Sequence, residues 1–263
     1  MRRAGAVVAE MLARCSAAVR PGITTAELDA IGAAVIRENG ATSSFLGYYG
    51  YPATICTSVN DEIVHGIPGR RKLHEGDIVG IDVGAIVEGW HADAAVTVPV
   101  GKVKPEAARL IRVTEEALRR GIAAARPGNR LGDIGAAVQS YAEGEGYSVV
   151  RNYVGHGIGR AMHEAPQVPN YGTAGQGRPI SPGLCIAIEP MLNGGDAATR
   201  VEADGWTVRT ADGSLSAHFE HTLAVTEEGP VVLTVPAPAA RERPERRTSP
   251  ARPAARRAAA ARR

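Results

Sequence analysis

The sequence GDIVGID (residues 76–82) has a counterpart 107 residues later, GLCIAIE (residues 183–189). Each stretch starts at a glycine, continues as a short apolar run and reaches a carboxylate, Asp82 or Glu189, six residues after the glycine. Short apolar runs bounded by glycine are typical of buried strands. We therefore expect two equivalent strands, each ending at an acidic side chain, and this repetition decides the fold.

The repetition extends upstream into helical segments. Residues 20–22 and residues 126–128 both read Arg-Pro-Gly, 106 residues apart. Each is followed by the pentapeptide Ile-Gly-Ala-Ala-Val, at residues 31–35 and 134–138. The same features occur in the same order in both halves, which indicates an internal duplication.

The ends of these helices can be placed from capping signals. Thr24 and Glu27 have the spacing of a capping box, and the helix that they start should end near Gly40. The equivalent helix should run from near Leu131 to about Gly144.

A second acid follows in each half. Asp93 precedes a β-rich run at 94–100, and Glu220 precedes one at 222–225. Helices grouped before strands favour an α+β fold over βαβ alternation. Two such halves should pack about a pseudo-two-fold axis, with antiparallel strands that bring the four acids together at the centre.

Charge divides the chain into a body and a tail. The 263 residues include 30 basic and 28 acidic side chains, for a net charge of +2. Residues 236–263 hold nine Arg and two Glu, so the remainder has 21 basic and 26 acidic residues and a net charge of −5. We expect one domain over 1–235 and a disordered Arg/Ala/Pro-rich basic tail over 236–263, which lacks the apolar residues of a core. Weak contact with RNA or the ribosome and a solvated tail without a partner both fit this composition.

Composition also bears on location. No run approaches the ~20 apolar residues of a membrane span, and no apolar signal core follows the first residues. Cys15, Cys56 and Cys185 are too few and too widely spaced for a disulfide framework. We expect a cytoplasmic protein, a monomer by default, in which Cys185 is a small buried residue.

The four acids indicate a metal site. Asp82 and Glu189 interrupt apolar strands, where a carboxylate is unfavourable unless it is paired or bound to a cation. An arginine partner would suffice for a single buried acid. Four carboxylates in one place would repel each other strongly, and two divalent cations would relieve that repulsion. With one imidazole, His156, these oxygens favour Mn²⁺, Fe²⁺ or Co²⁺, and also admit Zn²⁺.

Two further histidines stand in segments marked by glycine or proline. His65 occurs in a loop that continues Gly-Ile-Pro, and His163 follows His156 by seven residues in a glycine-rich segment. Glycines beside His156 should permit close backbone approach and unusual φ angles. A lone histidine is more often structural than catalytic, but this setting favours function for both.

Taken together, these motifs resemble those of the bacterial type I methionine aminopeptidases. The resemblance covers about residues 3 to 234, and the spacings of 11, 63, 33 and 31 residues between successive ligands fit the family. The stretches that carry it are HGIP (65–68), IDV (81–83), GWHAD (89–93), GHGIG (155–159), MHE (162–164), IEPM (188–191) and FEHT (219–222).

The resemblance implies a pita-bread fold and a two-metal hydrolase that removes the initiator methionine from nascent proteins and prefers a small second residue. It implies that Asp82 chelates one metal, that Asp93 and Glu220 bridge both, and that His156 and Glu189 complete the other site.

Catalytic roles and a substrate pocket also follow from the resemblance. His163 would stabilise the tetrahedral intermediate, His65 would contact the scissile amide, and Glu189 would take a proton from the attacking water. Besides His65 and His163, the residues implied for substrate binding are Tyr48, Tyr51, Cys56, Met162, Trp206 and Phe45. At Met162 the family has an aromatic residue, and at Phe45 a cysteine, so the pocket here should differ in shape while keeping its apolar character. Asn60 and Ser216 match contacts to a monovalent cation in some relatives.

The alternative within the same fold is a proline-directed hydrolase related to aminopeptidase P or prolidase. Such enzymes usually carry a large extra N-terminal domain, whereas the first repeat here starts by about residue 4. A non-catalytic binding protein of this fold would be expected to have lost metal ligands, and all five are present.

Overall fold

Each half of the chain begins with two helices, in agreement with the expectation of helices grouped before strands. The structure, a computed structural model, describes residues 1–235, and the predicted tail at 236–263 lies outside this range. The helices are α1 (Arg2–Ala18), α2 (Thr25–Glu38), α3 (Pro105–Ala124) and α4 (Leu131–Gly144), with a short 3-10 turn, η1 (Tyr48–Gly50).

The strands form one large sheet and two small ones. The nine-stranded sheet has the order β1-β4-β5-β14-β9-β7-β8, with β2 paired to β4 and β15 paired to β14. The three-stranded sheets are β13-β10-β6 and β11-β12-β3. In the first half the strands are β1 (Thr42–Ser43), β2 (Ile55–Val59), β3 (Glu62–Val64), β4 (Ile78–Val87) and β5 (Trp90–Pro99). In the second half they are β6 (Ser148–Val149), β7 (Gly155–Gly157), β8 (Glu164–Val168), β9 (Cys185–Ile188), β10 (Met191–Asn193), β11 (Thr199–Val201), β12 (Val208–Thr210), β13 (Ser216–His218), β14 (Glu220–Thr226) and β15 (Gly229–Val232).

Local capping explains where the paired helices begin. The Thr24 side chain accepts a hydrogen bond from the Glu27 backbone, and the Glu27 carboxylate accepts one from the Thr24 backbone, as the capping box predicts. In α4 the Asp133 carboxylate accepts from the Arg130 N–H at 2.7 Å. The predicted bounds of this second helix are confirmed.

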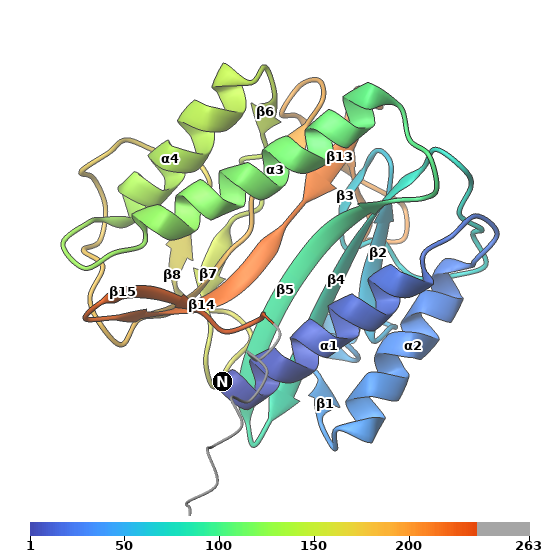
Figure 1. Cartoon of the computed structure of the whole chain (residues 1–263), viewed down its shortest axis with the longest axis horizontal. Coiled ribbons are helices and arrows are strands. Elements are labelled where there is room, and N and C mark those ends of the chain that lie inside the picture. Colours follow the sequence, from blue (N-terminus) through green and yellow to red (C-terminus); the bar gives the residue numbers. More distant parts are fainter. Residues whose placement is uncertain (236–263) are drawn as a thin grey trace, which may run out of the picture.

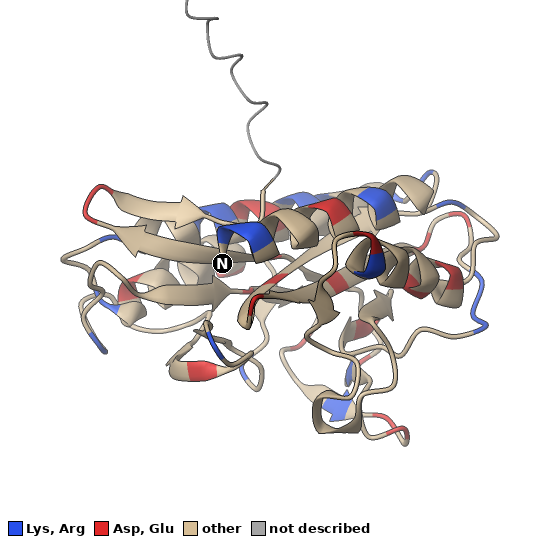
Figure 2. Ribbon diagram, turned by 90° about the horizontal axis from the view of Figure 1, so that it is seen from below, with Lys and Arg blue, Asp and Glu red and all other residues tan. Residues whose placement is uncertain are grey.

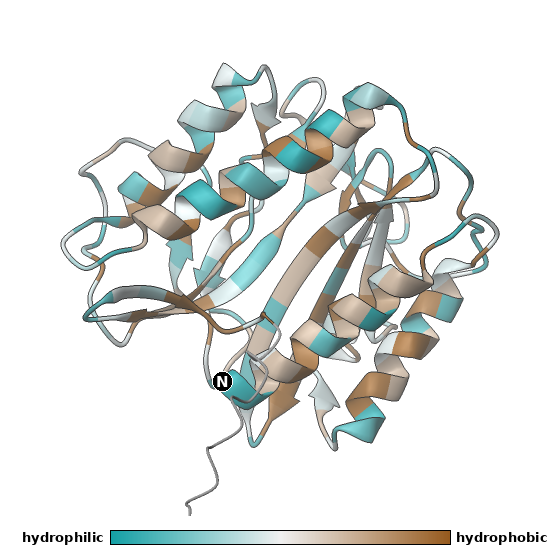
Figure 3. Ribbon diagram, viewed as in Figure 1, coloured by the Kyte–Doolittle hydropathy of each residue, from teal (hydrophilic) through white to brown (hydrophobic). Residues whose placement is uncertain are grey.

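The helices all lie on one side of the large sheet (Figures 1 and 2). The apolar face of α1 and α2 packs on β2, β4 and β5, and a second core joins α3 and α4 to β9 and β14. Figure 3 shows the apolar stripes of the helices and the apolar central strands that these cores contain. The two halves meet where β14 pairs antiparallel with β5. This arrangement confirms the α+β pita-bread fold with antiparallel strands.

The predicted strand ends need three corrections. Glu220 is the first residue of β14 rather than preceding the strand. Asp82 lies within β4, which continues to Val87, and Asp93 lies inside β5 rather than before it. The reason is that β4 and β5 form one long hairpin, closed by Glu88 and Gly89 with φ of 53° and 73°. Glu189, by contrast, follows the last residue of β9 as predicted.

The cysteines are all free thiols, in agreement with the expectation of no disulfide framework. Cys185, however, is partly exposed rather than buried. Along β9, Ile186 and Ile188 face the helical core, so the alternating side chain of Cys185 points to the opposite face. Within residues 1–235, none of the helices combines the length and the apolar character required to span a bilayer.

Candidate active site

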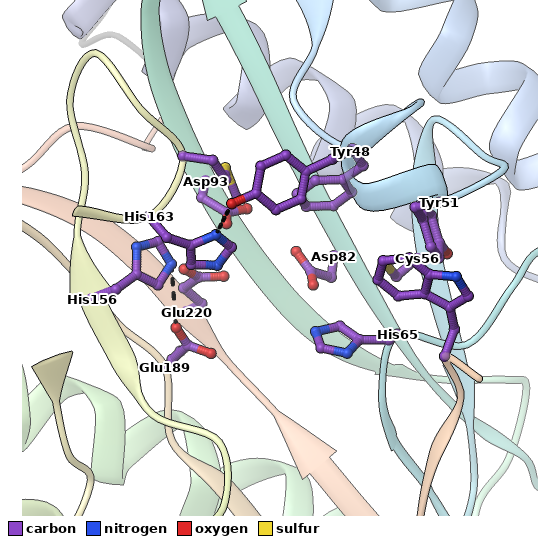
Figure 4. Close-up of a pocket in the computed structure, with 13 residues that line it drawn as sticks. Tyr48, Tyr51, Cys56, His65, Asp82, Asp93, His156, His163, Glu189 and Glu220 are labelled. Carbon is purple, nitrogen blue, oxygen red and sulfur yellow. Dashed lines mark hydrogen bonds and ion pairs between the residues drawn. The ribbon is translucent and has the colours of Figure 1, made fainter. Parts of the chain in front are cut away.

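Five adjacent strands of the large sheet bring the expected metal ligands together. In sheet order, β4, β5, β14, β9 and β7 contain or directly precede Asp82, Asp93, Glu220, Glu189 and His156. All five residues line one cavity, on whose wall the acids and His156 gather (Figure 4). The convergence predicted from the repeat is therefore present.

Strand register explains why these side chains share a face. Gly84, two residues beyond Asp82, pairs with Asp93. Ala95, two residues beyond Asp93, pairs with both Asp82 and Glu220. Residues two apart on a strand, and residues paired across strands, point to the same side of a sheet. Because the two halves pair antiparallel, the acidic side chains of both halves point toward the same place.

His156 is oriented by the backbone that surrounds it. Its Nδ1 lies 2.9 Å from the carbonyl oxygen of Gly157, which can only accept, so Nδ1 carries the proton and Nε2 has a free lone pair. Nε2 lies 3.5 Å from Glu189 Oε1. One ligand atom from each of Asp93, His156 and Glu220 lies within 4.8 Å of the others. This is the proximity that a shared cation requires.

The glycines on either side of His156 serve close packing. A Cβ on Gly155 would lie 2.4 Å from the Ala187 oxygen, and one on Gly157 would lie 2.4 Å from the Ala165 oxygen. The prediction of close backbone approach at these two glycines is therefore correct. The expectation of unusual φ was wrong for these two residues, because strand β7 holds them in an extended conformation between β8 and β9.

Burial makes the carboxylates unstable as free anions. It raises the pKa of Asp82 to about 7. Burial first, and then the neighbouring carboxylates, raise the pKa values of Asp93, Glu189 and Glu220 well above their usual range. Over residues 1–235, Asp82 Oδ1, Asp93 Oδ1 and Glu220 Oε1 are buried without a hydrogen-bond partner.

Buried oxygens of this kind are costly unless a cation or donor satisfies them. No arginine or lysine forms an ion pair with the four acids in the part of the chain that the structure describes, so the arginine alternative is not supported. The donor set fits divalent cations well: several hard carboxylate oxygens and one imidazole nitrogen with a free lone pair.

The two accessory histidines also border the cavity. His65 directly follows β3 and has φ of 60°, which turns the chain sharply at the cavity edge. Its ring lies edge-on to Trp206, with centroids 6.3 Å apart. His163 lies with its ring centroid 4.2 Å from that of His156, and its Nδ1 lies 2.7 Å from the Tyr48 hydroxyl. Burial lowers the pKa of both histidines, that of His65 to about 4.

The rest of the cavity is apolar. Tyr51, Cys56 and Met162 are almost fully buried there, and Trp206 packs against Tyr51 with centroids 5.0 Å apart. Phe45 completes this wall, edge-on to Tyr51 at 6.5 Å. The predicted substrate-binding residues therefore all line the same cavity as the acids: Phe45, Tyr48, Tyr51, Cys56, His65, Met162, His163 and Trp206.

Two supporting residues were missed from the sequence. The Thr222 hydroxyl accepts from the Asp93 N–H and donates to the Asp93 carbonyl oxygen, at 2.9 and 2.8 Å. Asn170, fully buried, donates to the Glu189 carbonyl oxygen at 3.0 Å. Thr222 could have been noticed as part of FEHT, because it lies two residues beyond Glu220 on the same strand face. No sequence pattern marks Asn170.

Asn60 and Ser216 lie side by side, with the Ser216 N–H donating to the Asn60 carbonyl oxygen at 2.9 Å. Their side chains are engaged elsewhere: Asn60 bonds to Asp77 and Ile78, and Ser216 donates to Leu192. A monovalent cation at this pair stays a prediction.

Comparison with known proteins places this fold and acid cluster in a class of metal-dependent peptidases. A family model described as metallopeptidase family M24 matches residues 1–227. A methionine aminopeptidase of Clostridium perfringens is 51% identical over 235 residues, which cover 89% of this chain and 94% of that relative. The crystal structure of methionine aminopeptidase from Rickettsia prowazekii superposes with a TM-score of 0.88 at 46% identity, covering 89% and 95% of the two chains.

The chain therefore belongs to metallopeptidase family M24 and, within it, to the methionine aminopeptidases. A prolidase from Pyrococcus furiosus shares the fold, with a TM-score of 0.71 at 21% identity. This chain covers only 62% of that prolidase. The comparisons thus favour the methionine aminopeptidases over the proline-directed alternative.

Proposed function

We propose that this chain releases the N-terminal methionine of nascent polypeptides by metal-dependent hydrolysis of the first peptide bond. The observation that carries the proposal is a single cavity with two chemically different parts. One part holds four acids and His156. The other is lined by aromatic and sulfur-bearing side chains, including Met162 and Cys56, which suit a flexible thioether.

We assign two divalent cations to the acid cluster, where Asp82, Asp93, His156, Glu189 and Glu220 would hold them. The buried carboxylate oxygens without partners support this assignment. When bound, such ions polarise a scissile carbonyl and lower the pKa of water. Mn²⁺, Co²⁺ and Fe²⁺ are the candidates, with Zn²⁺ as a further one; a monovalent cation at Asn60 and Ser216 is a separate proposal.

The remaining chemistry falls to side chains in and beside the acid cluster. Glu189, itself one of the four acids, would accept a proton from the attacking water. His163 would donate a hydrogen bond to the carbonyl oxygen of the scissile bond. The Tyr48 hydroxyl at its Nδ1 is compatible with this role, because in the tautomer where the hydroxyl donates to Nδ1 the ring proton is on Nε2.

His65 would contact the nitrogen of the scissile amide. With a pKa of about 4 its imidazole is neutral at pH 7, so it offers one N–H and one lone-pair nitrogen and does not act as an imidazolium. Its ring stands beside Trp206, at the junction of the apolar and acidic parts of the cavity. A peptide whose first side chain fills the apolar part would place its first amide near this point.

The assay that tests the function is methionine release by protein stripped of metal, with Mn²⁺, Co²⁺, Fe²⁺ and Zn²⁺ added back in turn. We expect release from Met-Ala-Ser with at least one of these ions and much slower release from Met-Lys-Ser. Equal rates for the two peptides would contradict the preference for a small second residue. Release of the first residue only before proline would favour the proline-directed alternative.

We also propose that the protein acts in the cytoplasm as a monomer. Three free cysteines support a reducing compartment. Residues 1–235 hold the complete cavity, which supports a single catalytic domain. Contact of the basic tail with RNA or the ribosome is testable by comparing ribosome binding of the full chain with that of a chain ending at residue 235.

A further inference from the structure

The turn at residues 45–51 has an inner and an outer face. Phe45, Tyr48 and Tyr51 line the active-site cavity. Leu46 and Tyr49, which alternate with them, are 59% and 86% exposed, among the largest exposures of apolar side chains over residues 1–235. One short segment therefore supplies both a wall of the cavity and an apolar surface outside it.

Internal hydrogen bonds hold this turn rigid. The Gly47 N–H donates to the Tyr51 oxygen at 2.8 Å, and the Tyr51 N–H donates back to the Tyr48 oxygen at 2.9 Å. The Ser43 hydroxyl accepts from the backbone N–H groups of both Phe45 and Leu46 at 3.1 Å. The exposed side chains are thus carried by a preorganised backbone, which reduces the entropy lost when a ligand binds.

Tyr49 adopts a backbone conformation that tyrosine rarely takes. Its φ and ψ are 47° and 25°, in the left-handed region that favours glycine or asparagine. Strained residues of this kind concentrate at functional sites. In this conformation the ring stands in solvent and packs edge-on to Tyr48, with centroids 4.7 Å apart. Tyr48 in turn contacts His163.

The rings of His163, Tyr48 and Tyr49 therefore form a continuous row that leads outward from the cavity. The cavity wall formed by Tyr48 is continuous with the outer surface, because the Tyr48 ring packs on that of Tyr49. A peptide whose first residue fills the apolar part of the cavity, and whose later residues leave along this wall, would bring its third and later residues to Tyr49 and Leu46.

We propose that Leu46 and Tyr49 form an outer docking surface for the third and later residues of the peptide substrate. The inference rests on the proposed function and extends it beyond the two residues at the cleaved bond. An exposed aromatic ring beside an aliphatic side chain offers apolar contact to many side chains without reading a particular one. That tolerance suits an enzyme whose substrates differ in sequence after the second residue.

The test compares a short and a long substrate in the full-length, metal-loaded protein. Met-Ala dipeptide cannot reach the outer surface, whereas Met-Ala-Ser-Phe-Lys-Leu can. In Tyr49→Asn, whose new residue tolerates the left-handed backbone, we expect KM for the hexapeptide to rise about three- to tenfold. Dipeptide KM and both kcat values should stay unchanged. Tyr49→Phe, which keeps the ring, should behave like the original protein.

Three results would overturn the proposal. An equal rise in KM for both peptides would mean that Tyr49 acts through Tyr48 and the cavity. An unchanged hexapeptide KM would mean that the outer surface does not touch substrate. A rise in hexapeptide KM in Tyr49→Phe equal to that in Tyr49→Asn would exclude the aromatic ring as the contact with the peptide. Absence of methionine release from every peptide by the unaltered protein would instead refute the proposed function.

Discussion

Stripping the divalent cations should make the stability of the protein fall steeply as the pH rises from 7 to 8. The reason is the set of raised carboxyl pKa values in the acid cluster. An acid whose pKa is raised on folding stabilises the native state fully below its unfolded pKa, near 4. That contribution is lost as the pH rises toward the folded pKa, because the unfolded chain then binds fewer protons than the native one.

The size of the effect follows from the individual groups. Because burial raises the pKa of Asp82 from 3.8 to about 7, ionising this group by pH 7 lowers the stability of the native state by on the order of 4 kcal/mol. Above pH 7, each of Asp93, Glu189 and Glu220 that stays protonated in the native state lowers the free energy of unfolding by about 1.4 kcal/mol per pH unit. One such group would lower the melting temperature by roughly 3–6 °C per pH unit in a domain of this size.

The histidines do not mask this trend. Burial lowers the pKa values of His65, His156 and His221 to about 4 and that of His218 to about 3. Because folding lowers the pKa values of these histidines, they make the stability rise with pH, but mainly below their pKa in the unfolded chain, near 6.5. Between pH 7 and 8 the carboxyls therefore dominate.

The assay is the thermal midpoint, followed by circular dichroism at half-unit pH steps, with chelator and with added Mn²⁺. In the chelated protein, Glu220→Gln should make the thermal midpoint fall less steeply with pH, by the amount that corresponds to about one proton. Glu116→Gln is the matched control, because hydrogen bonds from Arg119 and Arg120 hold the pKa of Glu116 near 2 and it is ionised throughout. Saturating Mn²⁺ should flatten the slope. A chelated protein whose midpoint does not change between pH 7 and 8 would refute the reasoning.

Two further variants test the parts around the cluster. Arg209→Met should lower the free energy of unfolding by about 2–4 kcal/mol in urea titrations followed by tryptophan fluorescence, since it removes a 2.6 Å partner from the buried carboxylate of Glu62. Arg200→Met, which removes a half-exposed ion pair on the neighbouring strand, should change the free energy of unfolding by less than about 1 kcal/mol. Similar losses of stability in the two variants would contradict the distinction between the buried and the half-exposed ion pair. His163→Ala should retain two metal equivalents in elemental analysis while kcat falls about 10²- to 10³-fold, and loss of metal would make His163 a ligand after all.

Much of the fold could be predicted because its signals are local. A capping box needs only Thr24 and Glu27, and the end of α4 near Gly144 depends on the residues beside it. The duplication was visible because the same short motifs recur in the same order. The five candidate ligands could be proposed because acids in apolar strands are rare enough to be informative, and because their spacing resembles a known family.

Other features depend on residues far apart in the chain. The length of β4 beyond Asp82 follows from its pairing with β5, and the exposure of Cys185 follows from which face of β9 meets the helices. Asn170 supports Glu189 only because the chain folds it there. Such contacts join positions whose sequence neighbours give no hint of the partner.

The sequence by itself determined the capped helices, the repeated halves and the chemical character of the candidate ligands, because capping hydrogen bonds and side-chain chemistry depend on residues close together in the chain. Only the tertiary structure decided how the halves meet. The antiparallel register of β5 against β14 sets Ala95 opposite Glu220, and so aligns carboxylates 127 residues apart, Asp93 and Glu220, on one face. Register is a property of paired strands and not of either strand alone, which is why the shape of the cavity and the row of rings at its mouth had to be read from the folded chain.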